Sequence, residues 1–237
     1  MTMQNIAINN LFSKPLNLHA YPVDYFQGKP LPYPLIQANQ QVLIETQQAL
    51  DEAIKAHPLR LITSTLLYQP NGYFPIEPSF DIYPNVTYLM QPQPNKPQSD
   101  HLIPTFFGRL NAQLERSFIP DKGRSFSNKP YQAITKRLDV HYTLMVFIFN
   151  KSDYRSLGRE TGLYRYLRTH IIEAWCQTIG VMGGSFQEKS QWLAIGEQFE
   201  LNMKKSEDKR KYNAIHHHLT WLAHRTLGDS PITHWRY

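Results

Sequence analysis

Two residue types in this sequence could support phosphate chemistry: a histidine in a strand-like segment and a tyrosine on a polar helix. His141 lies in the run VHYTLMVFIFN (140–150), and an imidazole can bind Mn²⁺ or a similar ion that polarises a phosphate. Tyr212 precedes His216 by one helical turn, and a tyrosine oxygen can attack such a phosphate and hold it covalently. Asp139 could add a carboxylate ligand. A lone strand histidine is more often a hydrogen-bonded core residue, so both interpretations of His141 stay open.

Positive charge is concentrated in the second part of the chain. The formal net charge is +6; residues 101–237 hold 20 Lys and Arg against 12 Asp and Glu, whereas residues 1–100 hold 5 against 7. A surface that follows phosphates requires such a concentration. We therefore expect DNA contacts in two clusters and near Arg225, although a solvated helix start would also explain the first cluster. The clusters are Lys204, Lys205, Lys209, Arg210 and Lys211, and Arg155, Arg159, Arg165 and Arg168.

Aromatic and histidine side chains accompany these basic residues. Phe126, Tyr131, Tyr164 and Tyr166 could stack on unpaired bases, although at 13% aromatic content many rings must belong to the core. The run His216 to His218 points in three helix directions, so it cannot offer three ligands to one ion. We expect it on a solvated face or against phosphate.

Composition limits the class of protein. The chain has 237 residues, 41% of them hydrophobic, which is typical of a globular protein. Cys176 is the only cysteine, which excludes an intrachain disulfide and a cysteine-based zinc site. No apolar run reaches the length of a membrane helix, and the first residues lack a basic segment followed by an apolar one. We expect a cytoplasmic protein with a Pro-rich arm at 1–34 and one domain at 35–237.

The expected elements alternate between helix and strand. Apolar spacing predicts helices at 35–57 and 99–117, a helix ending at Gly180, and a helix at 206–227. Strands are predicted at 59–68 and at 137–150, the second in the centre of the sheet, with a hairpin of 191–195 and 198–203. Segments 70–98, with a short strand at 85–90, and 120–136 are predicted loops. The predicted class is α+β, with an antiparallel sheet flanked by helices.

Several segments resemble a known family. VHYTLMVFIFNKSDYRSLG (140–158) is the most distinctive, followed by IIEAWCQTIG (171–180) and HLTWLAHRT (218–226). HPLRLITSTLLYQP (57–70) and FFGRLNAQLE (106–115) are weaker matches. Over residues 45–227 the chain resembles YagK/YfjJ-type prophage proteins, which are akin to inovirus replication initiators. The resemblance implies an HUH-type endonuclease core, in which two strand histidines hold a divalent metal that faces a nucleophilic tyrosine.

The chain departs from this pattern at both active parts. The histidine positions fall on Tyr142 and Leu144, or on His141 and Thr143 with a shift of one residue. The tyrosine position falls on Trp221, which has no nucleophilic oxygen. The neighbouring lysine position falls on His224.

These departures lead to the expectation of a DNA-binding protein derived from a rolling-circle replication initiator of phage or mobile-element origin. It would be catalytically degenerate, act in control of replication or transcription, bind single-stranded or hairpin DNA, and need no cofactor. One alternative is an active nickase that uses Tyr212 with His141 and requires Mn or Mg. Another is a phage-related protein-interaction factor.

Overall fold

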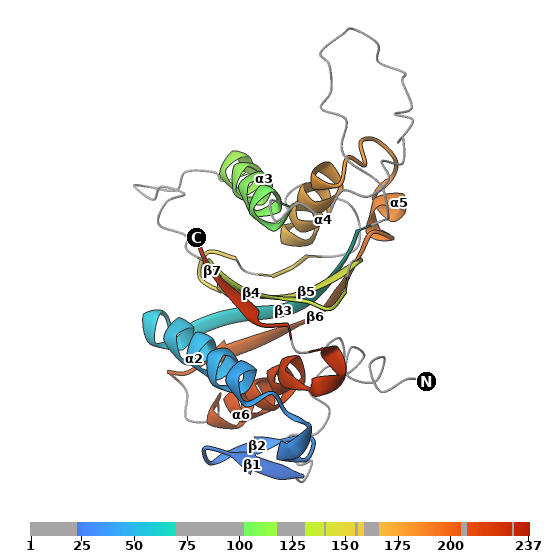
Figure 1. Cartoon of the computed structure of the whole chain (residues 1–237). Coiled ribbons are helices and arrows are strands. Elements are labelled where there is room, and N and C mark those ends of the chain that lie inside the picture. Colours follow the sequence, from blue (N-terminus) through green and yellow to red (C-terminus); the bar gives the residue numbers. More distant parts are fainter. Residues whose placement is uncertain are drawn as a thin grey trace, which may run out of the picture.

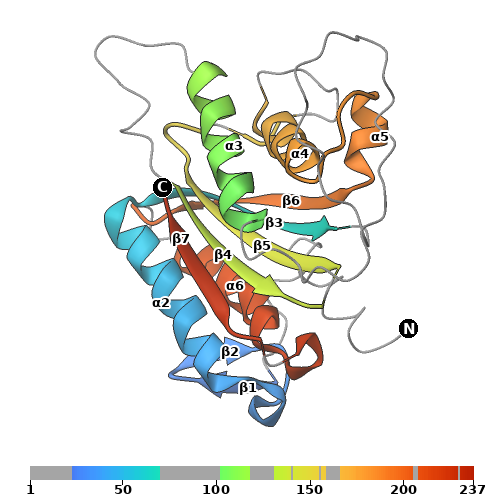
Figure 2. The ribbon, with the colours of Figure 1, turned by 45° about the horizontal axis from the view of Figure 1, so that its top comes forward.

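The fold is a five-stranded antiparallel sheet between two layers of helices (Figure 1). The computed structural model describes residues 23–69, 102–117, 131–139, 141–154, 156–158, 166–204, 208–228 and 230–237. Helices α3 (Leu102–Ser117) and α4 (Leu167–Thr178) cover one face, and α2 (Gln40–Ala56) and α6 (Asp208–Leu219) cover the other (Figure 2). The predicted α+β class is confirmed.

The strand order places the most apolar strand in the centre. The order is β6-β3-β5-β4-β7, and every neighbouring pair is antiparallel. The predictions of a strand at 59–68 and of a central strand ending at Asn150 are confirmed. The strands are β3 (Leu59–Tyr68), β4 (Tyr131–Arg137), β5 (Tyr142–Asn150), β6 (Leu193–Asn202) and β7 (Ile232–Arg236).

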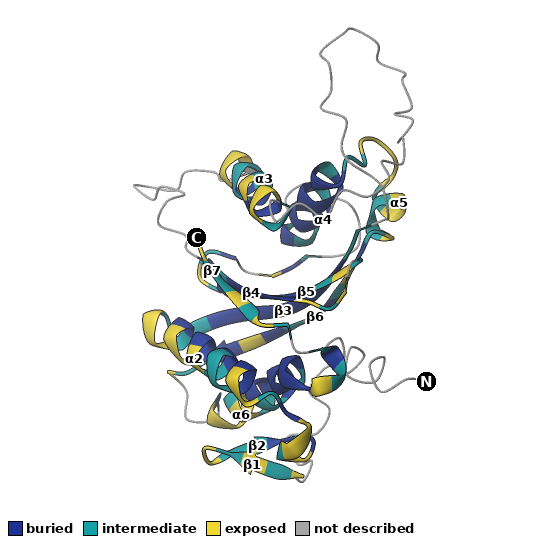
Figure 3. Ribbon diagram, in the orientation of Figure 1, coloured by how far each residue is buried: buried dark blue, intermediate teal, exposed yellow. Residues whose placement is uncertain are grey.

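Strand β5 is apolar on both sides because each side faces a separate core. Leu144, Val146 and Ile148 belong to the core shared with α2 and α6. Alternate residues, Met145, Phe147 and Phe149, belong to the core shared with α3 and α4. Side chains alternate across a strand, so a strand covered on both faces has no polar side (Figure 3).

Helix α4 is anchored to the sheet by Trp175. The Trp175 indole nitrogen donates hydrogen bonds of 3.1 Å to the carbonyl oxygens of Tyr68 and Trp192. Its ring packs edge-on against Phe106 of α3. The short helix α5 (Phe186–Ser190) follows and begins with a capping box from Ser185.

The described part of the N-terminal arm packs into the core. Strands β1 (Asp24–Phe26) and β2 (Lys29–Leu31) form a hairpin. Gln27 and Gly28 both have positive φ at its turn, which matches the twist of a two-residue hairpin. Leu31 and Tyr33 are buried against the layer of α2 and α6. Figure 1 shows these helices between the hairpin and the sheet.

The prediction of a loop is wrong for residues 131–136, and the prediction of one strand over 137–150 is wrong in its first part; residues 120–130 of the predicted loop lie outside the described residues. Strand β4 already starts at Tyr131, and a turn separates it from β5. The Asp139 carboxylate accepts hydrogen bonds from the backbone N–H groups of His141 and Tyr142 at 2.7 and 2.8 Å. An aspartate that bonds the backbone two residues on favours a turn, and β4 and β5 pair as neighbouring antiparallel strands.

The predicted hairpin at 191–203 is one continuous strand, β6. The register with β3 shifts between Thr63 and Thr65, opposite Gly196. A glycine inside a strand often marks such a bulge. Gly196, which suggested a turn, therefore lies at a bulge within the strand.

The last helix is shorter than the sequence predicts. Helix α6 ends at Leu219, and two 3₁₀ turns follow, η3 (Thr220–Ala223) and η4 (Arg225–Leu227). Helix α2 is likewise preceded by a 3₁₀ turn, η1 (Leu35–Gln37), and begins after its cap Asn39. Strand β7 was not predicted. The predicted loop and strand within 70–98 lie outside the described residues. None of the described helices has both the length and the apolar character needed to cross a membrane.

Candidate nucleic-acid interface

The positions that the resemblance assigns to paired histidines lie at the start of β5. Tyr142 and Leu144 share the face toward α6, where Leu144 is fully buried. In the alternative register, the His141 ring nitrogen Nδ1 lies 3.1 Å from the carbonyl oxygen of Gln69. Thr143 turns to the opposite face and lines an open hollow there. Neither register places two metal-binding side chains together.

Trp221, at the expected tyrosine position, belongs to a group of three rings. Its ring centroid lies 5.1 Å from that of Tyr33 and 5.3 Å from that of His224. Tyr33 and His224 meet edge-to-face at 4.7 Å. The Tyr33 hydroxyl donates to the carbonyl oxygen of Thr220, and burial raises its pKa. These rings hold η3 against the segment that follows β2, and they provide no nucleophile at position 221.

Lys136 is a candidate functional residue that the sequence analysis did not identify. It is fully buried on β4, directly beside Leu144 of β5. Its Nζ donates a 2.9 Å hydrogen bond to the carbonyl oxygen of Leu222. Burial lowers the pKa of the nearby His224, and the charge of Lys136 lowers it further. The alternation of side-chain types in YQAITKR could have indicated that Lys136 lies on a strand. It could not have shown that this lysine is buried in the core.

Tyr212 lies in a polar network away from the sheet. Its hydroxyl donates to the Asp51 carboxylate of α2 and accepts from Lys29 of β2. The Lys29 Nζ also lies 4.7 Å from the centre of the Tyr212 ring and 3.3 Å from Asp51 Oδ2. Burial and the Asp51 carboxylate raise the pKa of Tyr212. A raised pKa disfavours the phenolate, so Tyr212 is poorly suited to nucleophilic attack.

The structure does not bring Tyr212 and His141 together. Tyr212 lies one turn after Asp208, whose carboxylate accepts a 2.6 Å hydrogen bond from the backbone N–H of Asn202. His141 precedes Tyr142, which pairs with Tyr68, and Asn202 pairs with Leu59 at the other end of β3. The ten residues of β3 span about 30 Å. The Asp139 carboxylate is bound to backbone N–H groups of its own turn.

The histidine run is more buried than predicted. His216 and His218 are 2% and 3% exposed, so a solvated face is wrong for both. The His216 ring lies nearly parallel to that of Tyr212 at 6.3 Å, and the His218 ring contacts Phe199 at 4.6 Å. Burial, followed by the charge of Lys29, lowers the pKa of His216 to about 4. Within the described part of the chain, no three His, Cys, Asp or Glu side chains are grouped to hold a metal ion.

The residues of the predicted DNA-contact set that the structure describes lie at three places. Lys209, Arg210 and Lys211 are exposed in the first turn of α6, and Lys204 is exposed just before it. Arg168 is half-buried in the first turn of α4. Arg225 is exposed, and its Nε donates to the carbonyl oxygen of Ala38 at 3.3 Å. Arg155, Arg159, Arg165 and Lys205 lie outside the described residues.

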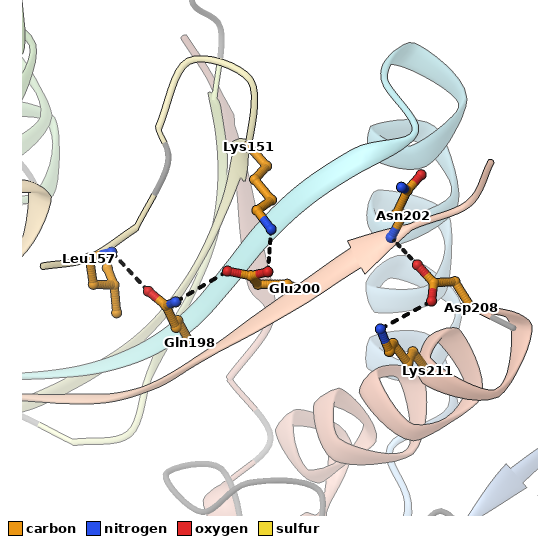
Figure 4. Close-up of polar contacts among 7 residues, drawn as sticks. All are labelled: Lys151, Leu157, Gln198, Glu200, Asn202, Asp208 and Lys211. Carbon is orange, nitrogen blue, oxygen red and sulfur yellow. Dashed lines mark hydrogen bonds and ion pairs between the residues drawn. The ribbon is translucent and has the colours of Figure 1, made fainter. Parts of the chain in front are cut away.

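Polar contacts along β6 fix the start of α6 (Figure 4). Asp208 is buried, bonds the backbone of Asn202 and pairs with Lys211 at 3.2 Å. Farther along the strand, Glu200 pairs with Lys151 and accepts a 3.3 Å hydrogen bond from Gln198, which accepts from the Leu157 backbone N–H at 2.9 Å. Strand β6 therefore contacts Lys151 and Leu157, which follow β5, and also orients the first turn of α6.

The sequence comparison assigns the family. The family model of the YagK/YfjJ C-terminal domain matches residues 94–231, more than half of the chain. The chain belongs to this family. The match runs from before α3 to the segment between η4 and β7, and it therefore includes β5 and α6 but not β3 or α2. No curated protein and no solved structure gives a significant match.

Proposed function

We propose that this protein binds DNA through a surface derived from a replication initiator, without the tyrosine chemistry that the resemblance implies. In this proposal it acts in the replication or transcription of a phage or mobile element. Its location is cytoplasmic. Membership of the YagK/YfjJ family supports this origin.

The observation that carries the proposal is the placement of cations in the first turn of α6. The N-terminus of a helix bears partial positive charge, so Lys or Arg there costs stability and an anion is favoured. Lys209 and Arg210 are exposed and form no ion pair with any described residue. Asp208 is the one acidic residue of this turn, and it is engaged with Lys211 and the backbone of Asn202. A DNA phosphate would offset the unfavourable charge.

The loss of nicking chemistry rests on the core around β5. Leu144 is buried at one expected histidine position, and Trp221 occupies the expected tyrosine position between Tyr33 and His224. Tyr212, the possible substitute, is held by Asp51 and Lys29 far from His141. These contacts favour a binding role over a nickase with relocated residues.

Binding of labelled single-stranded and hairpin DNA, measured by fluorescence anisotropy at several salt concentrations, tests the proposal. We expect affinity to fall steeply with salt, because neutralised phosphates release counterions. The double variant Lys209→Gln/Arg210→Gln should weaken binding and lower the slope of log K against log salt by roughly one to two. Lys55→Gln, which removes an exposed cation from the last turn of α2, is the matched control and should bind like the unmodified protein.

The same samples, incubated with Mn²⁺ and separated under denaturing conditions, test for cleavage and covalent adducts. We expect neither product. A Mn²⁺-dependent adduct that Tyr212→Phe abolishes would contradict catalytic degeneracy and establish the nickase. An absence of salt-sensitive binding to either DNA would contradict the DNA-binding role and favour a protein-interaction factor.

A further inference from the structure

The hollow lined by Thr143 lies on the face of the sheet that α3 and α4 cover (Figure 2). Its volume of about 340 Å³ is in the range of sites for small ligands. Arg137 of β4 pairs with Thr143 of β5, and Thr135 of β4 pairs with Thr233 of β7. These side chains share one face with the buried Met145, which lies opposite Thr135. We call this cavity the Arg137 pocket.

Arg137 gives the pocket a positive charge. It is the one charged residue among those that line the cavity, and it forms no ion pair with any described residue. Its Nε donates to the carbonyl oxygen of Asp139 at 3.2 Å, which fixes the guanidinium. The Asp139 carboxylate is already bound to the backbone N–H groups of His141 and Tyr142. The two terminal nitrogens of Arg137 can therefore bind two oxygens of an anion side by side.

Hydroxyl groups surround this cation and favour a phosphate over a carboxylate. Thr143, Ser230 and Thr233 line the pocket, and none of their hydroxyls bonds a described residue. Thr143 lies directly beside Arg137, and Thr233 is its diagonal neighbour across the strands. Three hydroxyls and two guanidinium nitrogens outnumber the two oxygens of a carboxylate. A phosphate monoester presents three strongly accepting oxygens, which match this set better.

The remaining wall of the pocket is apolar and includes a fixed indole ring. Leu102 and Ile103 of the first turn of α3 line it together with Trp235 of β7. The Trp235 indole nitrogen donates to the Thr135 hydroxyl at 2.9 Å, and its ring centroid lies 5.3 Å from that of Phe107. Because these two contacts hold the ring, the wall is preorganised for a flat apolar group.

An amide group at the pocket can recognise the edge of such a flat group. Gln69, which follows β3, lines the pocket, and its side-chain amide bonds no described residue. The amide offers one donor and one acceptor together, the combination that pairs with the edge of a nucleobase. A heterocycle joined to a phosphate therefore fits the charge, the hydroxyls, the apolar wall and the amide at once.

We propose that the Arg137 pocket binds a nucleoside monophosphate. The phosphate contacts Arg137, Thr143 and Thr233, and the base lies against the apolar wall within reach of Gln69. This site goes beyond the proposed DNA binding, because α6 and its exposed cations lie on the other face of the sheet. A cavity of this size holds a single small ligand, so the ligand is a free nucleotide.

Isothermal titration calorimetry in a phosphate-free buffer tests the proposal with the 5′-monophosphates of adenosine, cytidine, guanosine and uridine. We expect at least one of them to bind at one site per chain. Arg137→Gln should weaken this binding by about ten- to 100-fold, and Thr233→Val by about two- to tenfold. Arg116→Gln removes an exposed arginine from the last turn of α3, away from the pocket, and is the matched control with no expected effect. Thermal unfolding confirms that each variant is folded.

Ligand fragments test whether both parts of the nucleotide contribute. The nucleoside without its phosphate and inorganic phosphate alone should each bind at least about tenfold more weakly than the nucleotide, because each makes only part of the contacts. Lys209→Gln/Arg210→Gln, which changes the first turn of α6, should bind the nucleotide like the unmodified protein.

The outcomes separate this pocket from the DNA-binding surface. If none of the nucleotides binds, or if Arg137→Gln binds them normally, the pocket proposal is overturned whatever the DNA titrations show. Inorganic phosphate that binds as tightly as the nucleotide would reduce the pocket to a simple anion site. A strand with a 5′ phosphate that displaces the nucleotide better than the same strand with a 5′ hydroxyl would overturn the free nucleotide and assign the pocket to a strand end.

Discussion

The Nζ atom of Lys136 donates a 2.9 Å hydrogen bond to the carbonyl oxygen of Leu222, which joins the sheet to the 3₁₀ turn η3 through the core. Lys136 is fully buried at this contact. A buried ammonium is retained only where its hydrogen bonds are made, because an unpaired buried charge is costly. The contact therefore fixes the turn that carries Trp221.

Replacing Lys136 with alanine should destabilise the fold. The variant leaves a cavity in the core and removes the donor for the Leu222 carbonyl oxygen, so we expect a loss of about 2–4 kcal/mol in the free energy of unfolding. Urea denaturation measures the change. Lys55→Ala, at an exposed position of α2, should change stability by less than about 0.5 kcal/mol. Equal stability of the two variants would refute the structural role of Lys136.

Replacing Tyr212 with phenylalanine should affect stability rather than chemistry. The change removes the hydroxyl that bridges Asp51 and Lys29, which should lower the free energy of unfolding by about 1–2 kcal/mol. Tyr25→Phe, at an exposed tyrosine of β1, should be nearly neutral. Chemical denaturation compares the two variants, and an unchanged stability in Tyr212→Phe would show that the network contributes little.

Stability should fall in mildly acidic solution because of His216. Its folded-state pKa is about 4, lowered by burial and by Lys29 from an ordinary 6.5, so the unfolded chain binds the proton more tightly. The contribution of His216 is complete above about pH 6.5 and is lost as the pH falls toward 4, by about 3 kcal/mol. Urea midpoints between pH 7 and pH 4 measure this loss.

His216→Gln provides the comparison for the pH experiment. Other histidines also have lowered pKa values, among them His170, His217 and His234, so the unmodified protein and the variant should both lose stability in acid. The unmodified protein should lose more. Parallel pH profiles would mean that His216 does not titrate on unfolding in this range.

Two glycines should respond in opposite directions to alanine. At Gly158, φ is +85°, and an added Cβ would lie 2.2 Å from Cγ of Tyr166. Gly158→Ala should therefore cost more than about 1 kcal/mol. Gly108 lies exposed within α3 with no atom within 4 Å of an added Cβ, so Gly108→Ala should stabilise the protein by about 0.5–1 kcal/mol. Thermal unfolding distinguishes them, and a neutral Gly158→Ala would rule out close packing against Tyr166.

Local patterns predicted most of the element types. The run 59–68 and the apolar segment ending at Asn150 were recognisable as strands, because β-branched and apolar residues in runs of this length favour a doubly buried strand. Helical spacing likewise predicted α2 and α3. Errors arose where the residues that favour turns are ambiguous. Asp139 forms a turn inside the segment that was predicted as one strand. Gly196 lies at a bulge inside a strand, where a turn was predicted.

The sequence by itself determined the α+β class, the family resemblance and the absence of a tyrosine at position 221, because these depend on residue identity and short-range periodicity. Only the tertiary structure decided which side chains meet. The sequence alone could not predict that Lys136 contacts Leu222, or that Tyr212 contacts Asp51 and Lys29. It also could not bring together the rings of Trp192, Tyr68 and Tyr142, which belong to three separate segments of the chain. Their proximity follows from strand order and register, which long-range packing of the two cores selects.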